Sequence, residues 1–167
     1  MDTIAKVKRF VKSECQKPTS KYGYEPYPYH FIPVVKYSLE LADKLRGDRE
    51  VVEIAAWLHD IGSIIHGRAN HHITGAKIAT NLLQKLQYPP EKIELVRRCI
   101  LHHRGSQRLK NETIEEQILA DADAMSAYDN LPGIFKAAFV YEGLDQGEAK
   151  KSVRQKLANK WRQLNFP

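Results

Sequence analysis

The stretch that decides the fold is VVEIAAWLHDIG, residues 51–62. Its side chains are apolar on nearly every side of a helix, and a helix of that kind is buried. Asp48, just before it, is a favourable N-cap residue. Two polar residues, His59 and Asp60, stand at its end, where unpaired polar side chains cost several kcal/mol. A divalent cation would satisfy them, since imidazole nitrogen and carboxylate oxygen both bind one at about 2.0–2.2 Å. A buried hydrogen bond with a helix cap before Gly62 would satisfy them as well.

Helical periodicity continues from this stretch in both directions. A stripe of apolar residues ends before Pro18, and Pro33 is a favourable first-turn residue for a helix that stops at Gly47. Residues 18–30 (PTSKYGYEPYPYH) are rich in Pro, Gly and Tyr and predict a connecting loop. Further helices are predicted at residues 70–88, 91–103, 112–128, 132–142 and about 147–164.

No segment alternates polar and apolar residues as a half-buried strand would, and the connections between helices are short. We therefore predict an all-α fold, a compact bundle of about seven to eight helices. A length of 167 residues suits one domain that spans the whole chain, residues 1–167, with flanking helices at 1–17 and 145–166.

Composition bounds the environment of the protein. Hydrophobic residues make up 43% of the chain and charged residues 28%. No apolar stretch approaches the roughly 18 residues that cross a bilayer. The first ten residues carry charges every few positions, unlike a secretory signal, so we predict a cytoplasmic protein without a membrane partner. Cys15 and Cys99 are too few for a disulfide framework.

The formal net charge is +6, and part of the excess lies in the tail, at Lys150, Lys151, Arg154, Lys156, Lys160 and Arg162. A basic surface attracts anionic ligands such as nucleotides or nucleic acid. It is also typical of a solvated helix face, which is the better interpretation of the tail. Nucleic acid stays a candidate partner without a supporting motif, because the sequence carries no RNA-binding or zinc-finger signature.

The histidines gather in one part of the sequence. All seven lie between positions 30 and 103. Asp121 and Asp123 add carboxylates to a later helix that is otherwise made of apolar and small residues. Several helices thus each bring one or two nitrogen or oxygen ligands, the usual way of building a metal site in a helical bundle. The seven histidines are His30, His59, His66, His71, His72, His102 and His103.

Four separated motifs follow His30 in a fixed order: LHDIG at 58–62, HHITGA at 71–76, CILHH at 99–103 and ILADADAMSAY at 118–128. In this order they resemble the HD-domain superfamily. In that superfamily an H…HD…D pattern supplies the metal ligands, and many members are phosphohydrolases that act on nucleotides or cyclic nucleotides. The resemblance covers about residues 28–130 and implies the HD-domain type of helical bundle.

The resemblance also implies a divalent metal cofactor, one or two ions per chain, of the kinds Mn, Fe, Mg, Co, Ni or Zn. The resemblance implies that Asp60 bridges the two ions if this chain is a two-metal member of the family. A metal-held water, oriented or deprotonated by Asp60, would then attack a small-molecule phosphoester such as a nucleotide. The implied metal ligands are His30, His59, Asp60, His71, His103 and Asp123.

Two of these ligands have close competitors in the sequence. His103 follows Val96 and Ile100 along one helical stripe and so is expected to face inward, but the neighbouring His102 is also partly buried by its pattern. Asp121 and Asp123 both flank the apolar face of their helix. The family places its ligand before a small-residue segment, which favours Asp123.

The sequence departs from the family at Ser63. Many members carry Glu or Lys three residues after the HD aspartate, where it handles protons or contacts phosphate. A hydroxyl replaces neither charge, so either a catalytic acid or base is expected elsewhere or the activity is expected to be weak. Arg68 and Arg104 are candidates for binding a substrate phosphate, and surface arginines are an equally good interpretation of both. His66 is predicted to lie in a loop without an assigned role.

Two other functions are compatible with the same motifs. Some two-iron members of the superfamily are oxygenases that cleave carbon bonds, and a second set of histidines suits that chemistry. A non-catalytic module that senses a metal or a nucleotide is the other alternative, and the uncharged residue Ser63 favours it. Turnover of a phosphoester separates the enzyme from the module, and dependence on dioxygen separates the hydrolase from the oxygenase.

Overall fold

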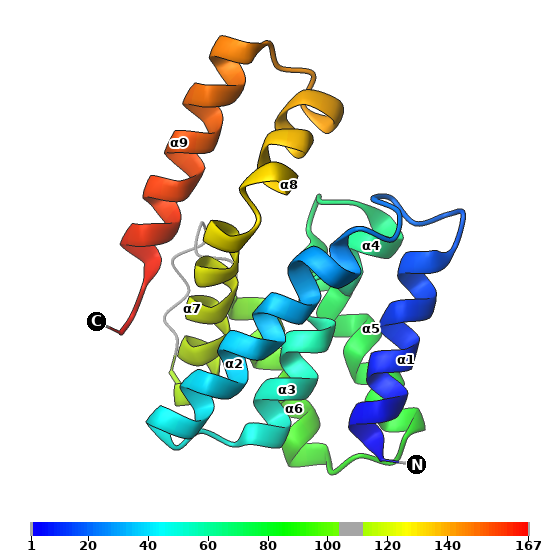
Figure 1. Cartoon of the computed structure of the whole chain (residues 1–167). Helices are drawn as coiled ribbons and strands as arrows, with labels where there is room; N and C mark the ends of the chain where they lie inside the picture. The colour runs from blue at the N-terminus through cyan, green and yellow to red at the C-terminus, as the bar shows by residue number, and fades with distance from the viewer. Residues whose placement is uncertain (1, 104–111, 167) are drawn as a thin grey trace.

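The computed structural model describes residues 2–103 and 112–166, and every regular element within them is helical (Figure 1). The predicted all-α fold is therefore confirmed. In chain order the elements are α1 (Thr3–Gln16), the π-helix η1 (Tyr27–Phe31), α2 (Ile32–Leu45), α3 (Arg49–Leu58), α4 (Ile61–His66), α5 (His71–Lys85), α6 (Pro90–His102), α7 (Ile114–Asp129), α8 (Leu131–Lys136), the π-helix η2 (Ala137–Tyr141) and α9 (Gln146–Gln163).

Helix α3 is the centre of the bundle. It contacts α1, α2, α5, α6 and α7, and Figure 1 shows it between α1 on one side and α7 on the other. Seven of its ten residues are buried, as the all-round apolar pattern predicts. The carboxylate of Asp48 caps the helix by accepting hydrogen bonds from the backbone N–H groups of Glu50 and Val51.

The stretch that was expected to form one helix through residue 62 is broken. Helix α3 ends at Leu58, a turn holds His59 and Asp60, and α4 begins at Ile61. The turn directs α4 against α5, where Gly62 approaches the backbone of His71 so closely that a Cβ atom would lie 2.2 Å from its carbonyl oxygen. The apolar pattern continues through the turn, so periodicity alone does not reveal it.

The loop predicted at residues 18–30 is only partly a loop. Its end forms η1, whose π-helical bond runs from the N–H of Ile32 to the carbonyl of Tyr27, five residues earlier. Prolines are tolerated here because the first turn of a helix leaves its N–H groups unpaired. Tertiary packing stabilises the element: Phe31 is fully buried, and the ring of Tyr27 stacks on Trp57 with centroids 5.6 Å apart. His66, expected in a loop, is the last residue of α4.

Helices α8 and α9 form a hairpin that extends beyond the rest of the bundle (Figure 1). A capping box between Asp145 and Glu148 begins α9. From there α9 runs back along α7, and the segment after it is tied to α7 by hydrogen bonds from Asn165 and Phe166 to Asp121. In the described part of the chain, none of these helices is long and apolar enough to span a membrane.

Candidate metal centre

The candidate ligands come from five separate places in the fold and meet at one end of α3. His59 and Asp60 lie in the turn between α3 and α4, and Asp123 lies in the middle of α7. The others begin or end their elements: His30 near the end of η1, His71 as the first residue of α5 and His103 just after α6. The break after α3 and the π-helix before α2 are therefore the local features that place three of these side chains, those of His30, His59 and Asp60.

The imidazole rings are oriented by their second nitrogen. In three of these rings Nδ1 donates a hydrogen bond to a backbone carbonyl. Nε2 then keeps a free lone pair, which points into the cluster. Carbonyl or carboxylate partners of this kind orient metal-binding histidines and fix their tautomer. The three contacts are His59 to Ala56 at 2.8 Å, His71 to Arg68 at 2.9 Å and His103 to Ile100 at 2.6 Å.

One group of ligand atoms combines His30, His59 and Asp60. The two Nε2 atoms lie 3.0 Å apart, and Oδ2 of Asp60 lies 3.3 Å from that of His30 and 3.8 Å from that of His59. Ligands bound to one ion at about 2.1 Å and separated by 90–110° are about 3.0–3.4 Å apart. Asp123 stands beside this group, with Oδ1 3.7 and 3.9 Å from the same two nitrogens. The residues fit a divalent metal.

A second group uses the other oxygen of Asp60. Oδ1 lies 3.2 Å from Nε2 of His71 and 3.8 Å from Nε2 of His103. Because Oδ2 faces the first group and Oδ1 the second, Asp60 has the geometry of a bridging carboxylate. Ser63, the residue in place of the family's Glu or Lys, donates its hydroxyl to Oδ1 at 3.3 Å and so helps to hold that carboxylate.

The protonation states of Asp60, His59 and His103 match what a cation requires. Burial by itself raises the pKa of Asp60, but His59 and His30 outweigh burial and hold the pKa well below its usual value. Burial lowers the pKa of His59, and it lowers the pKa of His103 to about 3. At neutral pH the carboxylate is therefore ionised and these two imidazoles are neutral, which are the forms that bind metals.

The structure separates the competing residues. Asp123 lies beside the first group, whereas Asp121 accepts hydrogen bonds from the backbone N–H groups of Asn165 and Phe166 on another side of α7. His103 points into the second group, whereas the Nδ1 atom of His102 lies 2.8 Å from a carboxylate oxygen of the fully buried Glu116.

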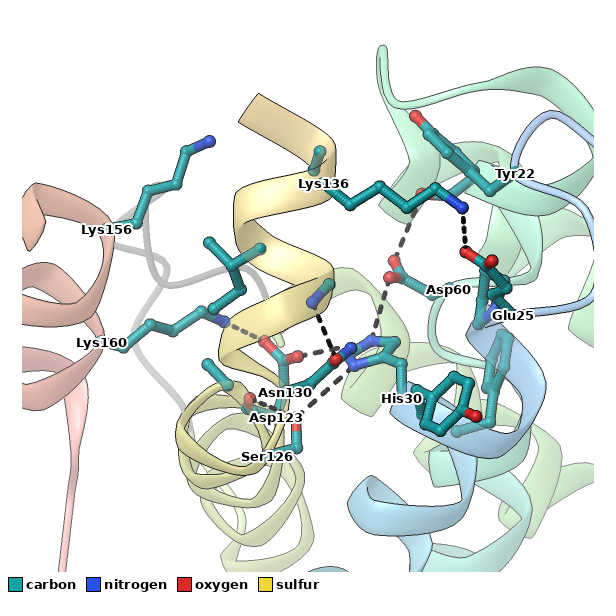
Figure 2. A pocket seen from close by; sticks show the side chains of 18 of the residues that line it. Tyr22, Glu25, His30, Asp60, Asp123, Ser126, Asn130, Lys136, Lys156 and Lys160 are labelled. Carbon is teal, nitrogen blue, oxygen red and sulfur yellow. Dashed lines mark hydrogen bonds and ion pairs between the residues drawn. The ribbon is translucent and has the colours of Figure 1, made fainter. Parts of the chain in front are cut away.

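A cavity of about 910 Å³ opens onto the cluster. His30, Asp60, His71, His103 and Asp123 line it at one end. Figure 2 shows His30, Asp60 and Asp123 turned toward one another, with Lys160 on the other side of Asp123. The rest of the lining includes aromatic side chains and several cations, among them Tyr22, Tyr29, Tyr141, Arg68, Lys136, Lys156 and Lys160.

The two arginines that sequence analysis proposed for phosphate binding have different outcomes. Arg68 lines the cavity, and Arg104 lies outside the described residues. Sequence analysis missed Lys156 and Lys160, which it assigned to a solvated basic tail. Their spacing of four residues indicates one shared helix face, but no signal in the sequence connects that face with Asp123.

A family model of the HD domain matches residues 27–128, and these residues carry both groups of ligands. Because the match spans more than half of the chain, the protein belongs to the HD-domain superfamily.

Two solved structures share its fold. An HD-superfamily hydrolase from Bacillus thuringiensis aligns with a TM-score of 0.70 and 23% identity over 98% of this chain and 83% of that one. A predicted HD superfamily hydrolase from an uncultured Thermotogales bacterium aligns with a TM-score of 0.54 and 23% identity, over 93% and 83% of the two chains.

Two relatives are similar in sequence. A tRNA (cytidine(56)-2'-O)-methyltransferase of Picrophilus torridus is 29% identical over 140 residues, which are 75% of this chain and 39% of that protein. An uncharacterized protein of Clostridium beijerinckii is 30% identical over 101 residues, which are 58% of this chain and 62% of that protein. The chain thus spans less than two thirds of the length of either relative.

Proposed function

We propose that the protein is a metal-dependent phosphohydrolase that cleaves a phosphoester of a nucleotide or a related small molecule, with water as the nucleophile. The observation that carries this proposal is the placement of Asp60, whose two carboxylate oxygens face two separate sets of imidazole nitrogens. A divalent ion bound at such a site lowers the pKa of water and offsets charge on the phosphoryl oxygens.

The residues of the chain would share the remaining work. His30, His59 and Asp123 would hold one metal together with Asp60, and His71 and His103 would complete a second position. Asp60 would orient or deprotonate the attacking water. The low pKa of this carboxyl keeps it ionised at neutral pH, the form that holds a cation.

The cavity supports a nucleotide-like substrate. Cations such as Arg68 and Lys156 line it and suit phosphate, and Tyr22, Tyr29 and Tyr141 line it and suit a base. One relative is named as a tRNA-modifying enzyme, but this chain matches only 39% of that protein. RNA oligonucleotides therefore belong in the substrate screen beside nucleotides and generic phosphoesters.

The test combines metal analysis with turnover. Purified protein is expected to carry a divalent metal and to hydrolyse at least one phosphoester, and His59→Ala or Asp60→Ala is expected to abolish both. His66→Ala is the matched control, because this histidine is exposed at the end of α4 and belongs to neither ligand group. Thermal stability should also fall when metal is removed, since binding to the native state adds to the free energy of folding.

Three results would contradict the proposal in different ways. Equal metal content in the parent and in both variants would refute the site. Binding of metal and nucleotide without turnover would indicate a sensing module. A reaction that consumes dioxygen would indicate the oxygenase chemistry of some superfamily members.

A further inference from the structure

Helix α9 brings a cationic face to the candidate metal centre from outside the region that matches the HD domain, which ends at residue 128. Lys156 and Lys160 are one helical turn apart, and both line the cavity. Figure 2 shows Lys160 reaching from α9 to Asp123. The basic tail of the sequence is therefore, in part, a wall of the site.

The contact between Lys160 and Asp123 leaves the ligand atom of Asp123 free to face a metal. The ammonium forms an ion pair with Oδ2, whereas Oδ1 is the atom that lies 3.7 Å from His30 and 3.9 Å from His59. A lysine ammonium has three donor positions, and Asp123 takes one of them. The Lys160 side chain is 30% exposed and lines the cavity. The remaining donors can thus meet a substrate next to the metal groups.

The position of α9 is fixed by contacts that do not involve the metal groups. Asp121, which is 2% exposed, accepts the backbone N–H of Asn165 at 2.8 Å and that of Phe166 at 3.0 Å. Tyr128 on α7 also donates its hydroxyl to the carbonyl of Leu157 at 2.9 Å. These contacts lie on both sides of Lys160 in the sequence, so they hold the helix turn that carries it against α7.

The chain also lacks a charge at the position where many family members place one. Ser63 stands three residues after Asp60, and its hydroxyl is bonded to the Asp60 carboxylate. A phosphate that approaches the metal groups therefore meets no cation at that position. Lys160 offers one from another direction.

We propose that Lys160 is a substrate-binding residue that donates a hydrogen bond to a non-bridging oxygen of the phosphate, and that Asp121 is a positioning residue for it. This assignment rests on the proposed phosphohydrolase function. Charge-assisted hydrogen bonds to phosphate oxygens are among the strong ones in proteins, and lysine commonly makes them as a compact point charge.

The test measures binding of inorganic phosphate to the full-length, metal-loaded protein by titration calorimetry, with metal content determined for each sample. Lys160→Met is expected to keep its metal and to bind phosphate about tenfold or more weakly than the parent. Lys151→Met is the matched control, because it removes the same charge from an exposed position of the same helix; its phosphate affinity should equal that of the parent. Asp121→Asn should keep the metal and weaken phosphate binding.

The outcomes separate this assignment from the proposed function. Equal phosphate affinity in Lys160→Met and the parent would overturn the role of Lys160, while phosphoester turnover by the parent would still support the phosphohydrolase. Loss of metal from Lys160→Met would make Lys160 a support for Asp123 and would overturn the substrate contact as well. A metal-loaded parent that neither binds phosphate nor hydrolyses a phosphoester would overturn both proposals.

Discussion

Replacing Gly62 by alanine tests whether the close crossing of α4 and α5 builds the candidate site. A Cβ atom at this position would lie 2.2 Å from the carbonyl oxygen of His71, 2.5 Å from Oγ1 of Thr74 and 2.7 Å from the backbone nitrogen of Gly75. Uncrowded contacts of carbon with other heavy atoms need about 3.5 Å, so the two backbones must separate by about 1 Å. Two of the three obstructing atoms belong to the backbone, which cannot turn away as a flexible side chain can.

The expected cost of Gly62→Ala is that of overpacking, about 1–3 kcal/mol in the free energy of unfolding. In a chain of this length each kcal/mol corresponds to about 2–4 °C in the melting temperature. The displaced carbonyl belongs to His71, whose Nε2 atom lies 3.2 Å from Oδ1 of Asp60. Affinity for metal at the position that includes His71 should therefore fall more than affinity at the position that includes His30.

Urea unfolding of metal-free protein gives the first quantity, and metal titration gives the second. Gly75→Ala is the control from the other side of the same crossing, because its Cβ would meet its nearest neighbours at 3.4 Å and therefore fits. Glycine in a helix interior is less favourable than alanine by up to about 1 kcal/mol, so this variant should be as stable as the parent or slightly more stable. If Gly62→Ala and Gly75→Ala unfold at the same urea concentration, the crossing is not as tight as we infer.

Three further predictions concern the candidate ligands and their neighbours. Asp123→Asn is expected to weaken metal binding at least about tenfold, whereas Asp121→Asn retains the metal; the reverse result would exchange their roles. The metal-free parent should take up two equivalents of metal in a titration, and His71→Ala with His103→Ala should take up one; one equivalent in both would leave a single-metal site. Burial lowers the pKa of His103 to about 3 in the folded protein, against about 6.5 in the unfolded chain. As the pH falls, the imidazole is therefore protonated in the unfolded chain before it is protonated in the folded protein. The stability of metal-free protein should therefore fall as the pH decreases from about 6.5 toward 3, and His103→Asn should reduce that slope in urea unfolding measured across this range.

The helices could be predicted from periodicity, but the interruptions that place the ligands could not. The apolar run that begins at Val51 predicts a buried helix, and the structure confirms it. The same run gives no sign of the turn at His59 and Asp60, because the turn depends on a contact between Gly62 and a helix that begins nine residues later. The π-helix that carries His30 follows a proline-rich segment, and buried packing of its aromatic residues overrides the local preference for a loop.

The order of histidines and aspartates was enough to suggest the ligand set, and the choice between Asp121 and Asp123 shows why residues alone do not decide it. Both flank the same apolar face of α7. Their partners lie at the far end of the chain, 44 residues away for Asn165 and 37 residues away for Lys160. Local patterns carry no information about contacts at such separations. For the same reason Lys160 was assigned to a solvated face.

The ion pair of Lys160 also explains how the cluster can stay assembled before a metal binds. Asp60 and Asp123 are two carboxylates in one buried region, and such groups are costly unless each is paired. His30 pairs with the first carboxylate, its Nε2 atom 3.3 Å from Oδ2 of Asp60. For Asp123, burial raises the pKa, but Lys160 and His30 outweigh burial and hold it below its usual value. Because Lys160 uses Oδ2 and the histidines face Oδ1, these imidazoles can change from partners of the carboxylate to ligands of a metal without displacing the lysine. A helix outside the region that matches the HD domain therefore stabilises the charge of an aspartate inside it.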